Sequence, residues 1–160
     1  MFFLLDGYNI LFSLVDSAKP FSSQRQEIIH YLQTQFALLK LSGMLVFDGF
    51  HREDEESGRG YESPLEVVFT PKGLNADSFI LEQVTLAKNS KDVKVVTNDA
   101  GLTRQARALG AHVQTNHIFI AYLKGKKKSP PEKLMIESKK NKDRLQEIFE
   151  NHEHQDDNTL

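Results

Sequence analysis

The stretch MFFLLDGYNILF (residues 1–12) opens with five apolar residues and then reaches an acid, Asp6. An uninterrupted apolar run of this length is typical of a strand that is buried on both faces of a parallel sheet. Asp6 is followed at once by Gly7, and Asn9 comes two residues later. One acid after one strand does not define a site. The rest of the chain decides whether other acids reach the same place.

Beyond this stretch the sequence alternates between short apolar runs and segments with helical periodicity. Strands are expected at 43–47, 65–70, 93–99 and 111–115, and helices at 22–41, 75–89, 100–110 and 116–125. Ser22 or Ser23 is a candidate cap for the first of these helices and Asn75 for the second, while Gly110 would end the third. Segment 51–63 has almost nothing to bury and is predicted to be an exposed loop. Strands alternating with helices predict an α/β domain with a mainly parallel sheet and helices on both faces.

Length and composition limit the class of protein. A chain of 160 residues is long enough to bury a core as one domain. The absence of cysteine excludes disulfides, thiolate metal sites and Cys nucleophiles. The first residues lack the basic region of a signal peptide, and no apolar run approaches the roughly 20 residues that span a bilayer. We therefore expect a cytoplasmic protein with no membrane partner.

Charge is distributed unevenly along the chain, although the net charge is only −2. Residues 124–144 carry nine Lys or Arg against three acids. The predicted domains are accordingly 1–123 and a basic extension, 124–160, made of a hinge with a Pro pair, a helix and a polar tail. Lys126, Lys127 and Lys128 in this hinge could bind RNA phosphates without choosing a sequence. A solvated tail explains the same lysines equally well.

Three of the expected strands end in an acid: Asp6, Asp48 and Asp99. A fourth acid, Asp77, lies in the first turn of the helix expected at 75–89. Since the carboxyl ends of parallel strands share one edge, all four could meet there. Each acid alone has an ordinary explanation as a turn residue or a partner of the helix dipole.

Four carboxylates at one edge repel each other unless a cation neutralises them. Without cysteine or a convincing His pair, hard oxygen ligands favour Mg²⁺ or Mn²⁺ over zinc. That set of ligands is typical of metal-assisted phosphoryl transfer.

Four motifs in this order carry a family resemblance: DGYN (6–9), VFDG (46–49), VVFTPKGLNADS (67–78) and VVTND (95–99). Together they resemble the NYN family of PIN-like nuclease domains, and most of all its bacterial YacP-like branch, which includes a ribosome-associated endoribonuclease. The resemblance covers roughly residues 1–123. It implies a three-layer PIN-like α/β fold and an Mg²⁺- or Mn²⁺-dependent endoribonuclease whose partners are RNA and the ribosome.

The resemblance also implies roles for single residues. The metal ligands would be Asp6, Asp77 and Asp99, with Asn9 and Asp48 completing the catalytic set. Asn9 would hydrogen-bond a carboxylate or a metal-bound water, although a helix cap is an equally good explanation. Family members often carry Ser before the last acid, and this chain has Asn98 instead.

Further cations could contact the RNA backbone. Arg52, Arg59 and Lys72 follow strands and are candidates for RNA binding, although a solvated loop explains Arg52 and Arg59 as well. Arg104 and Arg107 are expected to cover an exposed helix face. Two other functions remain open: a noncatalytic RNA- or ribosome-binding module with the same fold, and a phosphatase acting on small phosphate esters.

Overall fold

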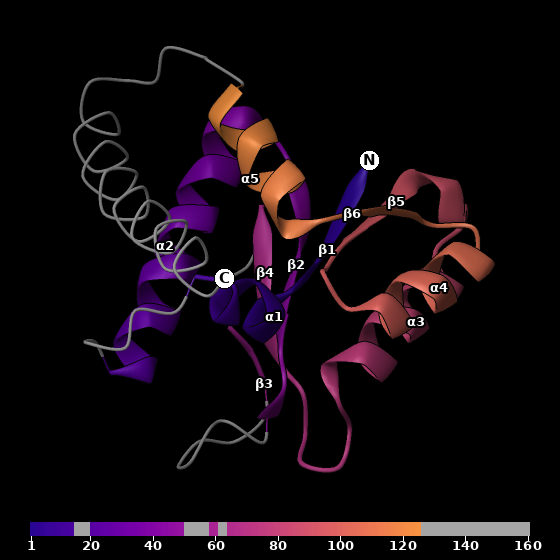
Figure 1. The fold of residues 1–160 in the computed structure, drawn as a ribbon, viewed down its shortest axis with the longest axis horizontal. Helices are drawn as coiled ribbons and strands as arrows, with labels where there is room; N and C mark the ends of the chain where they lie inside the picture. Colours follow the sequence, from indigo (N-terminus) through magenta and orange to yellow (C-terminus); the bar gives the residue numbers. More distant parts are fainter. Residues whose placement is uncertain (15–19, 50–57, 61–63, 126–160) are drawn as a thin grey trace, which may run out of the picture.

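The computed structural model describes residues 1–14, 20–49, 58–60 and 64–125 (Figure 1). In chain order the elements are β1 (Phe2–Asp6), α1 (Gly7–Phe12), α2 (Phe21–Leu39), β2 (Ser42–Phe47), β3 (Gly58–Gly60), β4 (Leu65–Phe69), α3 (Ala76–Leu86), η2 (Ser90–Asp92), β5 (Val93–Val96), α4 (Ala100–Ala108), β6 (His112–Gln114) and α5 (Asn116–Gly125). The alternation of strands and helices confirms the predicted α/β class. Within these ranges no helix combines the length and the apolarity needed to cross a membrane.

Six strands form one sheet in the order β3-β4-β2-β1-β5-β6. The first strand of the chain is central: Leu5 of β1 lies opposite Leu45 of β2 on one side and Val96 of β5 on the other. All strands except β3 run parallel, so their carboxyl ends share one edge of the sheet, called the carboxyl edge below. The opposite edge is called the amino edge. The mainly parallel sheet was predicted correctly.

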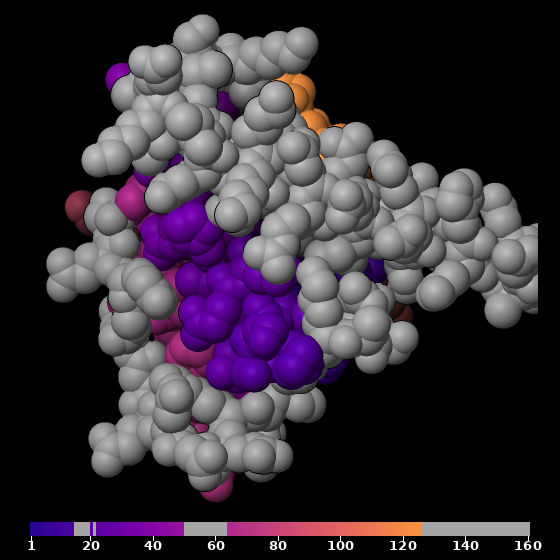
Figure 2. Space-filling model, turned by 90° about the vertical axis from the view of Figure 1, so that its left-hand side faces the viewer, coloured from indigo at the N-terminus to yellow at the C-terminus, as the bar shows by residue number. Residues whose placement is uncertain are grey.

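Helices cover both faces of the sheet and bury two apolar cores. Phe3 and Leu5 of β1 point into the core formed with α1, α2 and α5, whereas Leu4 points into the core formed with α3 and α4. This alternation follows from the two-residue period of a strand. Figure 1 shows α2 and α5 on one side of the sheet and α3 and α4 on the other. Viewed from the side of the sheet that α2 covers, α2 forms much of the described surface (Figure 2).

Two details of the helix ends differ from the sequence prediction. The first long helix begins at Phe21, directly after Pro20, and has no side-chain cap, so neither Ser22 nor Ser23 caps it. It ends at Leu39 because Lys40 adopts a left-handed conformation with φ 53°. The other two predictions were right: Asn75 caps α3 by accepting a hydrogen bond from the Ser78 N–H at 2.8 Å, and Gly110 follows α4 with φ 95°.

Three elements were not predicted from the sequence: β3, α1 and the single turn η2. Segment 51–63 was predicted to be a loop, but its residues 58–60 form β3, which pairs antiparallel with β4. A short edge strand is held by backbone hydrogen bonds and needs no apolar pattern, which is why GRG gave no signal. The short helix α1 directly after Asp6 was also not predicted. The rest of 51–63 and all of 126–160, including the predicted basic extension, lie outside the described residues.

Candidate active site

The four acids lie at the carboxyl edge, each on a different element. Asp6 ends β1, Asp48 follows β2 directly, Asp77 lies in the first turn of α3, and Asp99 is the N-cap of α4. They are called the acidic site below. Asp6 is the deepest, with 7% of its surface exposed, Asp48 and Asp77 are half-buried, and Asp99 is exposed. The site therefore opens from a buried carboxylate towards solvent.

Among the helices that begin at this edge, α3 and α4 each have an acid at or near the N-terminus, where negative charge is favourable. Asp99 uses one oxygen, Oδ1, to accept the Leu102 N–H of α4 at 2.7 Å. Asp77 is not needed to cap its helix, because Asn75 caps α3. A carboxylate in the first turn that is not needed for the cap is available for a ligand.

Burial and mutual repulsion disturb the titration of the two inner acids. The pKa of Asp6 is raised from 3.8 to about 7: desolvation by burial is the main cause and the charges of Asp77 and Asp99 add to it, while the Thr97 hydrogen bond lowers the pKa. The backbone N–H of Asn9 also lowers the pKa of Asp6. The side chain of Asp6 nevertheless accepts no capping hydrogen bond from helix α1. The pKa of Asp77 is raised by burial first and then by the charges of Asp99 and Asp48. The four carboxylates are thus electrostatically coupled.

Thr97 connects the deepest and the outermost acid. Its hydroxyl, 1% exposed as a residue, donates to Asp6 Oδ2 at 2.9 Å and accepts the backbone N–H of Asp99 at 3.0 Å. One side chain therefore fixes both the rotamer of Asp6 and the start of the turn that carries Asp99. From the sequence alone, Thr97 could contact a phosphate or cap the turn after its strand, and a link to Asp6 is not predicted. Its partner is 91 residues away, which no local pattern reveals.

Three asparagines form a second link across the site, called the asparagine network below. The Oδ1 of Asn9 accepts the Asn98 N–H at 2.8 Å and the Asn116 Nδ2 at 3.0 Å. Asn98 Oδ1 in turn accepts the Asn116 N–H at 3.0 Å. The side-chain oxygen of Asn9 therefore supports the turn before Asp99, a use that the sequence analysis did not foresee. Asn116, 2% exposed, was missed entirely.

The two Asp-Gly pairs have a steric explanation. A Cβ on Gly7 would lie 2.6 Å from the ring of Phe47, and one on Gly49 would collide with the Thr70 carbonyl. Glycine after Asp6 and after Asp48 therefore lets the ends of β1, β2 and β4 approach closely. The repeated Asp-Gly of the sequence reflects the packing of this edge.

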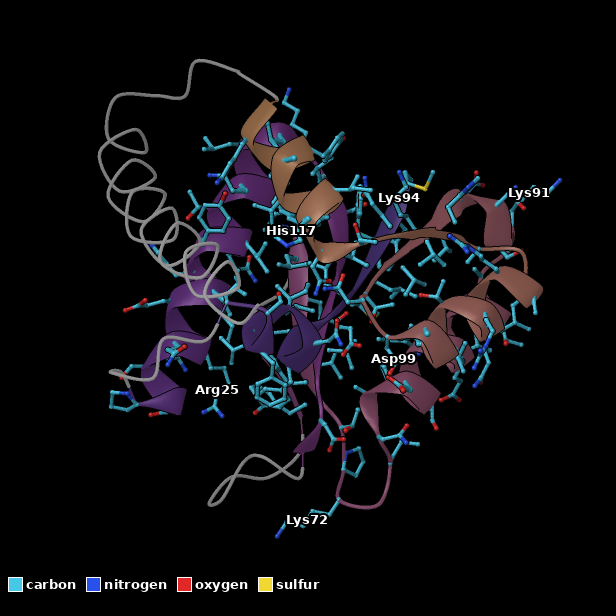
Figure 3. The ribbon with its side chains drawn as sticks, in the orientation of Figure 1. Arg25, Lys72, Lys91, Lys94, Asp99 and His117 are labelled. Atoms are coloured by element: carbon cyan, nitrogen blue, oxygen red, sulfur yellow. The ribbon has the colours of Figure 1, made fainter. Side chains whose placement is uncertain are left out.

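A cation that the sequence analysis did not single out also lies at this edge. Helix α2 runs antiparallel to β4: Gln33 donates to the Leu65 carbonyl at the start of the strand, while Arg25 lies 5.5 Å from the Phe69 ring centroid at its end. Arg25 also donates to the Tyr8 hydroxyl at 3.3 Å. Figure 3 shows Arg25 near the first turns of α2 and Asp99 at the start of α4, on opposite faces of the sheet.

The predicted RNA-binding residues are only partly described. Lys72 is exposed on the loop before α3, and its side chain points away from the sheet (Figure 3). Arg59 belongs to β3, but its side chain is not described. Arg52, Lys126, Lys127 and Lys128 lie outside the described residues.

The donors of the acidic site fit a hard divalent cation in chemistry. All are oxygen ligands. Burial first, and then repulsion, raise the pKa of Asp6 and Asp77, and a cation would stabilise the ionised carboxylates against both. In the part of the chain that the structure describes, no three Asp, Glu, His or Cys side chains stand close enough to hold one ion together. This does not conflict with Mg²⁺, which keeps several waters and binds one or two carboxylates directly.

Comparisons with known proteins agree with this α/β fold. The family model described as the YacP-like NYN domain matches residues 3–158. The fold is similar to crystal structures of Rae1 (YacP) from Bacillus subtilis: one matches with TM-score 0.61 and 18% identity over 94% of this chain and 83% of the other. A single-substitution variant of that protein matches with TM-score 0.62 and 21% identity over 77% of this chain and 74% of the other. No curated protein matches the chain. With nearly its whole length matched by the family model, the chain belongs to the YacP-like NYN domain family, a family of nuclease type.

Proposed function

We propose that this protein is a divalent-metal-dependent endoribonuclease that hydrolyses RNA phosphodiester bonds. Asp6, Asp77 and Asp99 would between them hold one or two Mg²⁺ or Mn²⁺ ions, each ion bound directly by one or two carboxylates and otherwise by water, with Asp48 and Asn9 beside them. One observation carries the proposal: four carboxylates from four separate segments lie at one edge, where burial and then mutual repulsion raise the pKa of the two inner ones. Repulsion of this kind is a liability for folding unless a cation is bound.

The chemistry divides between the ion and the chain. A bound divalent ion supplies a water nucleophile at neutral pH and stabilises charge on the leaving oxygen. The residues of the chain orient the site: Thr97 holds Asp6 Oδ2, and the asparagine network holds the turn of Asp99. The positive ends of α3 and α4 favour a phosphate at the same edge. Hydrolysis would leave a 5′-phosphate and a 3′-hydroxyl, with no side chain acting as a covalent nucleophile.

The substrate and its location are part of the same proposal. RNA is the substrate that a nuclease-type NYN family implies. The resemblance to a branch with a ribosome-associated member makes ribosome-bound mRNA the second substrate to test, and the cytoplasm the compartment. Arg52, Arg59, Lys72, Lys126, Lys127 and Lys128 remain the proposed RNA contacts outside the acidic site.

The test is a cleavage assay with purified protein on single-stranded RNA and on RNA bound to ribosomes. Cleavage should require Mg²⁺ or Mn²⁺ and stop on chelation. Asp77→Asn should abolish cleavage while RNA binding survives, because carboxylates hold the ion and not the phosphate. Metal-independent cleavage, or cleavage that survives Asp77→Asn, would refute the mechanism.

The noncatalytic RNA-binding module remains the second candidate, and one observation favours it. Within the described residues the acids are not gathered into a group of three around one point. Such a module would bind RNA equally well with chelator and with Mn²⁺ and would cleave neither substrate. Divalent-ion titration followed by the amide signals of Asp6 and Asp77 separates the two functions directly.

A further inference from the structure

A polar trough runs along β6, the strand at the end of the sheet opposite β3. It has a volume of about 550 Å³, and its lining includes Thr97 and Asn98 at one end and Lys94, Arg107, His112 and Gln114 along its length. Thr97 is the residue that holds Asp6, and Asn98 belongs to the asparagine network. One end of the trough is therefore formed by residues that support the acidic site, although none of the four acids lines it.

The trough is cationic, although the chain as a whole is slightly acidic. Lys94 and Arg107 line it, and none of the ten lining residues is Asp or Glu. In the described part of the chain, neither the Lys94 ammonium nor the Arg107 guanidinium pairs with a carboxylate; the Lys94 Nζ lies 6.0 Å from the Phe3 ring centroid. Lys94 and His112 are direct neighbours across β5 and β6. These donors are free for an anion.

An RNA strand needs such donors beside the acidic site. Its phosphates are anions, and four carboxylates repel every phosphate that is not neutralised by a bound ion. Lys72 points away from the sheet (Figure 3), so among the described cations it does not serve this purpose. The distance from Thr97 back to Lys94 along β5 is about 10 Å at the strand rise of roughly 3.3 Å per residue. This length accommodates further phosphates of an extended strand.

We propose that the RNA strand on one side of the cleaved phosphate lies in this trough, with Lys94 and Arg107 on its phosphates. This inference rests on the proposed function and adds the path of the substrate. The trough also offers an acceptor, because the buried Oε1 of Gln114 has no hydrogen-bond partner among the described residues. An unpaired buried acceptor is unfavourable, and a ribose 2′-hydroxyl or a base amino group would satisfy it.

The main test compares two double variants of the full chain that remove the same charge. Lys94→Gln/Arg107→Gln empties the trough of cations, whereas Lys88→Gln/Lys91→Gln removes two exposed lysines near the amino edge. Binding of a labelled single-stranded RNA is measured with chelator between about 50 and 200 mM salt. The trough variant should bind about 10-fold more weakly, and its salt slope should fall by about 1.4, or about 0.7 per lost phosphate contact. The control should behave as wild type.

Equal binding and equal slopes for the two double variants would overturn the trough proposal. If the two double variants behave alike while the wild-type protein still cleaves RNA with Mn²⁺, only the trough proposal is refuted and the proposed function stands. If wild type neither binds nor cleaves RNA, both the trough and the proposed function fail. Circular dichroism of each variant checks that both remain folded.

Gln114→Leu identifies the donor that meets the buried oxygen. With RNA and DNA strands of one sequence, a 2′-hydroxyl partner predicts weaker binding of RNA alone, by about 5-fold, as expected for one hydrogen bond. Equal losses for RNA and DNA indicate a base donor and leave the path intact. No loss for either strand would exclude nucleotide contact at Gln114 and shorten the proposed path to Lys94 and Arg107.

Discussion

The two edges of the same sheet differ sharply in chemistry. At the carboxyl edge Asp6, Thr97 and the asparagine network fill the space between strand ends with linked polar groups. At the amino edge a hollow of about 330 Å³ is lined largely by apolar side chains, among them Phe2, Met44 and Leu86. Leu86 is 70% exposed.

Strand direction explains the difference. In parallel βα units the helices that follow the strands begin at the carboxyl edge, so their unpaired N–H groups and caps gather there. The amino edge receives helix C-termini and has only packing to satisfy. A more apolar hollow is therefore not the better candidate for catalysis: the coupled acids make the carboxyl edge the proposed active edge. The predictions below test this contrast.

The largest effect should come from removing a single carboxylate at the active edge. Asp6→Asn should lower RNA cleavage by at least about 1,000-fold, because it would remove one of the proposed ligands of the ion. Asp92→Asn at the amino edge is the matched control and should leave the rate unchanged, since Asp92 bonds only its neighbour Asn89 among the described residues. Single-turnover rates with Mn²⁺ measure both. Similar losses in the two variants would remove the contrast between the edges.

The second effect is the pH dependence of stability in the metal-free protein. Because the pKa of Asp6 is raised from 3.8 to about 7, the folded state keeps a proton that the unfolded state releases between these values. The free energy of unfolding should therefore fall as pH rises from about 4 to about 7, by at most about 4 kcal/mol. Urea unfolding in chelator across this range measures it.

Asp6→Asn provides the control for that measurement. The variant should show a flatter profile and should be at least as stable as wild type above pH 7, because the amide cannot ionise. A wild-type protein whose stability rises over the same range would contradict the burial and repulsion at Asp6.

A smaller effect is expected from Thr97→Val, which removes the hydroxyl between Asp6 and the Asp99 N–H. The buried Asp6 carboxylate and the partly buried Asp99 N–H each lose a partner, so the free energy of unfolding should fall by about 1–3 kcal/mol. Thr97→Ser keeps the hydroxyl and should recover most of the loss. If Ser and Val destabilise equally, the methyl packing of Thr97 matters more than its hydrogen bonds.

The smallest effect should come from the amino edge. Leu86→Gln changes an exposed side chain with no polar partner and should alter stability by less than about 0.5 kcal/mol. Cleavage should be unchanged. A loss of RNA cleavage in this variant would mean that the apolar hollow takes part in function after all.

Much of the framework could be predicted from local patterns. The apolar runs that end in Asp6 and Asp48, and the cap at Asn75, are visible within a few residues, so the strands and the edge that carries the acids follow from them. The catalytic roles of these acids remain predictions. Local patterns could not show which distant residues become partners: Asn9 and Asn116 are 107 residues apart, and nothing in the sequence near either one points to the other.

Two further misses have different physical causes. The strand β3 is held by backbone hydrogen bonds, so its side chains carry no pattern. Arg107 was expected to cover a solvated helix face, and its exposure was predicted correctly. Its position in the wall of the cationic trough was not predicted, because that depends on where β6 ends relative to α4. To predict a surface site of this kind, one must know how helices and strands are arranged in space, and the periodicity of the sequence does not give that arrangement.

The order of strands in the sheet also bears on how the protein is made. β1 is synthesised first, yet one of its two neighbours, β5, comes about 90 residues later, and the asparagine network closes only with Asn116. An incomplete nascent chain therefore carries Asp6 without Thr97 or Asp99 and cannot assemble the acidic site. If that site cleaves RNA, each nascent chain is inactive during most of its own synthesis. It cannot attack the message that encodes it until nearly all of the folded domain has left the ribosome.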